Sequence, residues 1–187
     1  MRQLLIALAL TFNAAVAADD AALINEASFP AHWREGSQIM PRQGQIVLTY
    51  LWADIYAAAL YTALGVPPQQ AFDQQRDLRL ELFYLRDLKH SDIIKASATI
   101  LERQHPPTVL TPLVPELKKL QDSFGDIKRG DRLALNFSPQ RGLNLERNGK
   151  VIFNSQNPAL AKTYLGIWLA PDGLPENLRK TLMKLTP

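Results

Sequence analysis

The sequence of 187 residues contains no cysteine. Disulfides and thiolate metal ligands are therefore excluded, and so is a membrane anchor attached to a lipid-modified cysteine. If the chain is exported, as its N-terminus indicates below, packing alone must stabilise the fold.

Long runs of one charge and long apolar runs are also missing. The densest basic stretches are the pairs Lys118-Lys119, Lys128-Arg129 and Arg179-Lys180, and the formal net charge is only +3. We therefore expect no nucleic-acid partner. No apolar run after the N-terminus approaches the ~18 residues of a membrane helix, so we expect no transmembrane segment.

The motifs of common catalytic and cofactor sites are absent too. The sequence has no G-x-G-x-x-G stretch, no phosphate-binding loop and no nucleophile elbow around a serine. His32, His90 and His105 lack the spacing of metal ligands, so we expect neither a metal nor another cofactor. Asp54, a single acid in an aromatic stretch, has no visible partner and specifies no reaction by itself.

The N-terminus has the pattern of a secretory signal peptide. Arg2 gives the positive start, residues 4–12 (LLIALALTF) the apolar core, and Ala15-Val16-Ala17 an A-x-A cleavage site. We expect cleavage after residue 17 and export of residues 18–187 to the periplasm as one domain with a net charge of +2. The alternative is a buried N-terminal helix.

The middle of the chain has the pattern of one strand followed by helices. Residues 77–86 (DLRLELFYLR) alternate with period two, which predicts a strand. Residues 90–104 carry an apolar stripe at helical spacing, with Ser91 as the expected N-cap. Residues 105–115 contain four prolines and are predicted to be a linker. Pro115 then opens another helix.

The C-terminal part combines a meander with helices. Residues 131–153 have the pattern of three strands, of which the last two are joined by a type I′ turn at Asn148-Gly149. Asn157-Pro158 is a cap followed by a first-turn proline, and Pro175 opens the last helix. The order of elements predicts an α+β fold with helices on one face of a mainly antiparallel sheet.

Residues 49–61 (TYLWADIYAAALY) fit two structures. Their large side chains recur at helical spacing and the alanines favour a helix. A strand would place Trp52, Asp54 and Tyr56 on one face and mostly smaller residues on the other. The spacing alone favours the helix.

Three motifs resemble those of the bacterial chalcone-isomerase-like proteins, which are relatives of plant chalcone isomerase and of plastid fatty-acid-binding proteins. Residues 54–61 (DIYAAALY) are similar to the family's V-Y-x-x-x-L-Y strand, residues 129–152 to its G-D hairpin meander, and residues 164–183 to its L-G-I-W-L ending. The resemblance covers about residues 28–185. It implies an open-faced β-sandwich, a large antiparallel sheet backed by helices, and it makes residues 49–61 a central strand covered on both faces.

The resemblance also implies where an isomerase would hold its hydrogen-bond donors. Only Thr163 matches such a position directly. The other positions carry aliphatic residues, at about Leu48, Leu51, Ile93 and Ile100. Arg42 could replace the missing arginine only after a shift in register. We therefore expect no isomerase activity, because the developing oxyanion would lack positioned donors, and no charge-assisted contact to a carboxylate.

These observations predict a non-catalytic protein that binds a lipid, a fatty acid or another small apolar ligand between sheet and helices. The candidate lining residues are Tyr50, Trp52, Tyr56, Ile93, Ser97, Ile100, Thr163 and Tyr164. One alternative is a structural or interaction module in which the same aromatic rings fill the core. Another is an isomerase-type enzyme of unknown substrate, for which Asp54 and the tyrosines are the only candidate catalytic residues.

Overall fold

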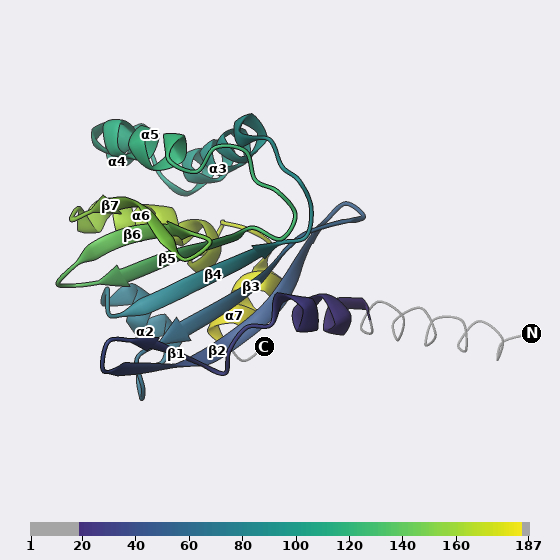
Figure 1. Ribbon diagram of the computed structural model, residues 1–187. Coiled ribbons are helices and arrows are strands. Elements are labelled where there is room, and N and C mark those ends of the chain that lie inside the picture. The colour runs from purple at the N-terminus through teal and green to yellow at the C-terminus, as the bar shows by residue number, and fades with distance from the viewer. Residues whose placement is uncertain (1–18, 185–187) are drawn as a thin grey trace, which may run out of the picture.

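A computed structural model describes residues 19–184 and contains one seven-stranded antiparallel sheet (Figure 1). The strands follow one another across the sheet in chain order, so each pairs with its neighbours in sequence. They are β1 (His32–Glu35), β2 (Gln38–Tyr50), β3 (Ala53–Thr62), β4 (Leu78–Tyr84), β5 (Arg132–Ser138), β6 (Gly142–Arg147) and β7 (Lys150–Ser155). The predicted α+β class with a large antiparallel sheet is confirmed.

Helices interrupt this meander between β3 and β4 and between β4 and β5, and they also precede and follow it. Residues 19–27 are helical and precede β1. The further helices are α2 (Pro68–Asp73), α3 (His90–Gln104), α4 (Pro107–Leu110), the 3₁₀ helix η1 (Thr111–Leu113), α5 (Val114–Asp122), α6 (Pro158–Leu169) and α7 (Glu176–Met183). None of those within the described part of the chain has the length and apolar character needed to span a bilayer.

The sheet is buried on both faces, which its central strand β4 shows most clearly. Leu78, Leu80 and Leu82 point into the main core, which also takes in residues of α3, α5, α6 and α7. Phe83 and Leu85 belong to a second apolar cluster on the opposite face. Residues 19–30 contribute Leu23, Ile24, Ala27 and Phe29 to that cluster. The helix layer therefore covers one face, as predicted, and the N-terminal segment covers part of the other.

The stretch at residues 49–61 is a hairpin, so the helix favoured by its spacing is wrong. Strand β3 carries Ala58 and Leu60 in the main core and Ala57 and Ala59 in the second cluster. A strand that packs on both faces needs apolar residues at every position, which hides the period of two. The central strand implied by the resemblance is confirmed for β3, but β2 already ends at Tyr50.

Two local predictions around α3 and α5 are also wrong. Residues 105–115 are not a linker, because α4 and η1 occupy most of them. The N-cap of α3 is Lys89 and not Ser91. The free N–H of His90 is instead satisfied from another part of the chain, since it donates to Asp126 Oδ1 at 2.8 Å.

The predicted turn and cap in the C-terminal part are confirmed. Asn148 and Gly149 both have positive φ, 51° and 78°, as a type I′ turn between β6 and β7 requires. Asn157 caps α6 by accepting hydrogen bonds from the backbone N–H groups of Ala159 and Leu160. The turn therefore joins β6 to β7, and the cap fixes where α6 begins.

Candidate functional site

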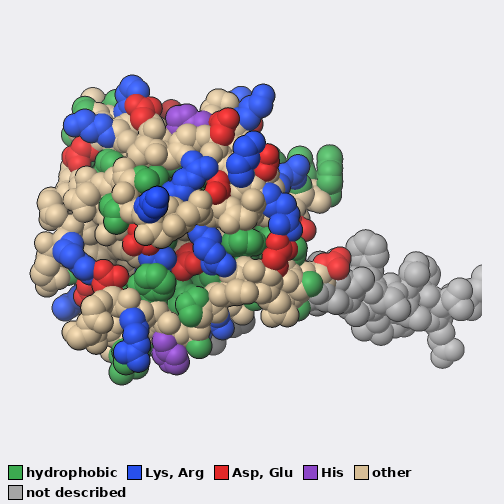
Figure 2. Space-filling view, in the orientation of Figure 1, with side chains coloured by type: hydrophobic (Ala, Val, Ile, Leu, Met, Phe, Trp, Pro, Cys, Tyr) green, Lys and Arg blue, Asp and Glu red, His purple; other side chains and the backbone are tan. Residues whose placement is uncertain are grey.

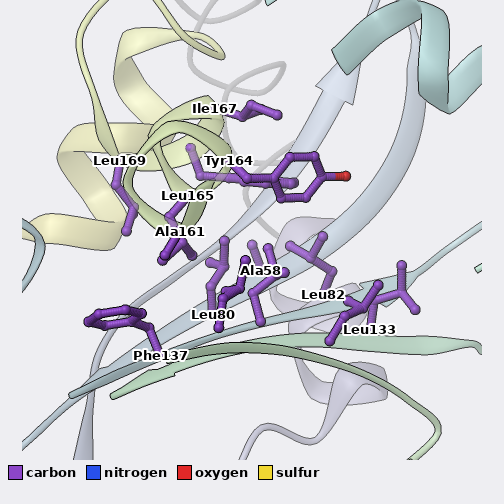
Figure 3. Packing of buried hydrophobic residues seen from close by; sticks show 14 of the residues in the cluster. Ala58, Leu80, Leu82, Leu133, Phe137, Ala161, Tyr164, Leu165, Ile167 and Leu169 are labelled. Atoms are coloured by element: carbon purple, nitrogen blue, oxygen red, sulfur yellow. The ribbon is translucent and has the colours of Figure 1, made fainter. Parts of the chain in front are cut away.

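A cavity of about 800 Å³ lies between the inner face of the sheet and helices α3 and α6. The sheet contributes an apolar floor of Leu80, Leu82, Leu133, Leu135 and Leu145. Figure 3 shows Tyr164 reaching from α6 above Leu82 and Leu133 of this floor. A volume of this size falls within the roughly 300–1,000 Å³ of small-molecule sites.

The cavity exists because α3 does not pack closely on the sheet. Only Ser97 and Leu101 of this helix are buried, although it has 15 residues. The helix is attached instead to its neighbours: Gln121 of α5 donates to Ser97 Oγ at 3.2 Å, and Gln104 Nε2 donates to the carbonyl of Gly166 in α6 at 2.9 Å. Ile93 and Ile100 on its inner side are only half-buried against the main core, and both line the cavity.

The polar groups deep in the cavity are mainly phenols. Tyr56, Tyr84 and Tyr164 line it together with Trp168. The indole Nε1 of Trp168 donates to the Tyr56 hydroxyl at 2.9 Å. The rings of Tyr56 and Tyr84 meet edge to face with centroids 5.5 Å apart, and those of Tyr164 and Trp168 do so at 5.9 Å. One wall of the cavity is therefore aromatic and rich in hydroxyl groups.

Burial decides the protonation state of these phenols. Removal from water raises the pKa of Tyr56, of Tyr84 and of Tyr164 well above the ordinary value of 10.0. For Tyr84 the neighbouring Tyr56 and Tyr164 add to the increase in pKa. At neutral pH all three side chains are uncharged and can donate O–H hydrogen bonds, and none of them can act as a phenolate base.

Charged residues lie only along the rim of the cavity. Asp92, Lys95 and Arg103 of α3 contribute to the lining and are exposed. Arg103 is committed to the chain that follows α6, because its Nε donates to the Asp172 carbonyl at 2.6 Å and another guanidinium nitrogen donates to that of Gly173. The cavity thus offers neutral hydrogen-bond donors at its aromatic wall and no cation among them.

Six of the eight residues predicted to form the pocket line this cavity: Tyr50, Tyr56, Ile93, Ser97, Ile100 and Tyr164. The other two do not. Trp52 lies on the turn between β2 and β3 and is 88 % exposed, so it is neither a core residue nor part of the cavity. Thr163 is buried but points elsewhere, since one residue along a helix turns the side chain by about 100° from Tyr164.

Of the aliphatic residues at positions where the resemblance implies isomerase donors, Leu48, Ile93 and Ile100 line the cavity, whereas Leu51 is exposed on the turn between β2 and β3. Leu48 is buried at the position where the resemblance implies an arginine. Arg42 cannot replace it, because its guanidinium donates to the backbone carbonyls of Phe29 and Pro30, which belong to the segment that covers the other face of the sheet. Asp54 lies outside the cavity and accepts a hydrogen bond from Thr49 Oγ1 at 2.7 Å.

Sequence reasoning missed two functional features of the site. Tyr84 was not among the expected lining residues, although the alternation of β4 puts it on the same face as Leu78, Leu80 and Leu82 and could have identified it. The hydrogen bond between Trp168 and Tyr56 links positions 112 apart in the chain and left no signal. Across residues 19–184 no group of three His, Asp or Glu side chains could hold a metal ion.

The described chain thus forms a curled antiparallel sheet with an apolar cavity between the sheet and the helix layer. The chain belongs to the chalcone isomerase-like family, whose model matches residues 22–184. None of the curated proteins in the comparison matches the sequence. Among solved structures, a fatty-acid binding protein from Arabidopsis thaliana matches with a TM-score of 0.61 and 14 % identity, over 83 % of this chain and 90 % of that one. At this identity the likeness concerns the fold alone.

Proposed function

We propose that this protein is a non-catalytic carrier or sink for a lipid-like molecule, which it holds in the cavity between sheet and helices. The observation that carries the proposal is the cavity itself, about 800 Å³ with a leucine floor. Its aromatic wall contains uncharged donors, and neither a base nor a cation lies among them. The fatty-acid binding protein of the same fold supports the same class of ligand.

The chemistry of the cavity narrows the class of ligand. An acyl chain suits the leucines of the floor, and a polar end group can accept hydrogen bonds from the hydroxyls of Tyr56, Tyr84 and Tyr164. A carboxylate buried there would lack the cation that makes such contacts strong, because Leu48 stands where an arginine would be needed. Ligands with an uncharged end group, such as fatty alcohols or esters, therefore fit better than ionised fatty acids.

The proposed place of action is the periplasm. The signal-peptide pattern at residues 1–17 lies outside the residues that the structure describes, so export is proposed from the sequence alone. Removal of residues 1–17 would leave every element of the sheet and helices in place. An exported carrier of this kind would move apolar molecules through an aqueous compartment.

The experiment compares two substitutions at adjacent positions of α3. Ile93→Trp places an indole in the cavity, whereas Ile94 does not line it, so Ile94→Trp is the matched control. The chain beginning at Ala18 is titrated with a fatty acid and the fatty alcohol of the same length, and native mass spectrometry detects any retained lipid. We expect alcohol binding in the parent and in Ile94→Trp, and at least about a tenfold loss in Ile93→Trp because the bound volume is filled.

Equal affinity of both tryptophan variants would show that ligand lies elsewhere. A parent protein that is empty after gentle extraction and binds none of a broad lipid panel would exclude the carrier function. Tighter binding of the ionised acid than of the alcohol would contradict the proposed role of the neutral phenols while leaving the cavity as the site.

A further inference from the structure

The end of the β2–β3 hairpin exposes three consecutive large apolar side chains. Tyr50 is 66 %, Leu51 70 % and Trp52 88 % exposed. Figure 2 shows hydrophobic side chains projecting from the body of the molecule at the end of this hairpin. None of the other exposed large apolar residues of the described chain is adjacent to another in the sequence: Ile39, Leu64, Val109, Val114 and Val151. A cluster of this kind indicates a contact surface.

The backbone conformation of this turn is unfavourable for the residue that adopts it. Leu51 has a φ of 55°, in the left-handed region where glycine or asparagine is favoured. A leucine there is conformationally unfavourable, and with most of its side chain in water it gains little from packing. The stability of the isolated domain therefore does not explain why a leucine occupies this position.

The tip is continuous with the mouth of the cavity. A shallow hollow is lined by Tyr50, Leu51, Trp52 and the start of α3. Tyr50, Ile55 and Leu88 belong both to this hollow and to the lining of the ligand cavity. Whatever covers the tip therefore also faces the route into the cavity.

Two cations without an ion-pair partner among the described residues lie beside the tip, together with two acids. Arg86 and Lys89 line the hollow, are exposed, and form no ion pair with any other described residue. Of the two acids there, Asp87 is paired with Lys128 at 3.0 Å, which leaves Asp92. Exposed Trp and Tyr rings next to free Lys and Arg side chains are the combination that proteins present to the interface of a phospholipid bilayer.

We propose that residues 50–52 dock the protein on a phospholipid surface, with the mouth of the cavity facing the lipid. This inference rests on the proposed carrier function, because docking gives an apolar ligand a direct path between bilayer and cavity. A bilayer suits the tip better than a protein pocket does, since its three apolar side chains project together from one narrow turn next to free cations.

The test uses the chain beginning at Ala18, which contains every described residue, and vesicles of phosphatidylcholine with or without phosphatidylglycerol. The variant Leu51→Asn/Trp52→Ser removes the apolar tip, and asparagine tolerates the left-handed backbone. Leu64→Asn is the matched control, because Leu64 is 75 % exposed and follows the other end of β3. Cosedimentation measures binding. Brominated lipids in addition quench the exposed Trp52, whereas Trp168 is buried and Trp33 stacks on Arg79.

We expect the parent and Leu64→Asn to bind vesicles equally, and the double variant to bind at least about tenfold more weakly. Phosphatidylglycerol should strengthen binding and salt should weaken it. Absence of vesicle binding, or equal binding by the double variant, would overturn the proposal. A dimer in sedimentation velocity that the double variant dissociates would assign the tip to a second copy of the chain and would overturn it too.

Ligand titration without vesicles separates this inference from the carrier function. The double variant should keep the parent's affinity for the fatty alcohol, since neither substituted residue lines the cavity, but should load more slowly from donor vesicles. If Ile93→Trp keeps full affinity while the double variant loses vesicle binding, the proposed ligand site fails and the docking surface stands.

Discussion

At the scale of single residues, the outer face of the sheet holds a buried network of charges. Arg79 and Glu81 of β4 are only 5 % and 4 % exposed. Glu81 accepts from Arg79 Nε at 3.2 Å and from Arg132 at 2.7 Å, and Arg79 also donates to Glu146 at 2.9 Å. Two arginines thus face two glutamates. The Arg79 guanidinium stacks 3.6 Å from the centroid of the Trp33 ring in β1, and Arg132 donates to the Ala27 carbonyl, so the network also holds the N-terminal segment on the sheet.

We expect Glu81→Ala to lower the free energy of unfolding by roughly 3–5 kcal/mol, because it removes the only buried glutamate of the network, so that Arg79 keeps Glu146 alone and Arg132 loses its glutamate. Urea unfolding monitored by circular dichroism measures this change. Asp122→Ala is the control, since Asp122 pairs with Lys118 at the surface and should alter stability little. Equal midpoints for the two variants would show that the network contributes no more than a surface ion pair does.

At the scale of elements, helix α7 packs directly on the backbone of β2 at a glycine. A Cβ built on Gly44 would overlap the Thr181 carbonyl oxygen and lie 2.8 Å from Leu182 Cα. Gly166 in α6 differs, because the nearest atom to its Cβ would be Ala170 Cβ at an ordinary 3.5 Å. Close approach of backbone therefore requires the first glycine and not the second.

Gly44→Ala should cost about 1–3 kcal/mol, because α7 must move away from the sheet. Gly166→Ala should be neutral or stabilising, since alanine is favoured over glycine by roughly 1 kcal/mol in a helix interior. Thermal unfolding of the two variants and the parent tests both expectations. A destabilised Gly166→Ala protein would contradict the space seen beside α6.

The sequence predicted those elements whose signals are local. The alternation of β4, the Asn148-Gly149 turn and the Asn157 cap each act within a few residues and could be recognised directly. The turn at Leu51 could not, because it contains neither glycine nor asparagine and its neighbours are apolar. Strand β2 left a weak pattern for a different reason. Its long course is mostly half-buried and includes a proline and a glycine. The pairing of β2 with β1 and β3 identifies it as a strand more clearly than its own residue pattern does.

At the scale of the whole molecule, the cavity depends on contacts that no stretch of sequence contains. The resemblance placed Tyr56, Ile93 and Ile100 around one pocket, and all three line the cavity. The volume itself arises because α3 is attached to α5 and α6 and so stands away from the leucines of the sheet. A filled core, the structural alternative, would have used the same residue types with α3 packed closer. Only the spatial arrangement distinguishes the two.

The buried phenols of the cavity give the molecule a specific sensitivity to alkali. In the unfolded chain Tyr56, Tyr84 and Tyr164 would ionise near 10, whereas in the folded protein burial raises the pKa of each above that value. The folded state then binds more protons than the unfolded state, so stability falls as pH rises. The contribution is complete below pH 10 and is lost progressively from about pH 10 upward.

Tyr164→Phe removes one of these groups and should make the fall in stability above pH 10 less steep. The slope per group approaches about 1.4 kcal/mol per pH unit. Urea unfolding at a series of alkaline pH values measures the slope, and absorbance of the phenolate form follows ionisation in the folded protein. Tyr50→Phe, at a tyrosine that is 66 % exposed, is the control for the loss of a hydroxyl group alone. The same slope in Tyr164→Phe as in the parent would mean that Tyr164 is reached by water, and the cavity would then be too wet to favour an apolar ligand.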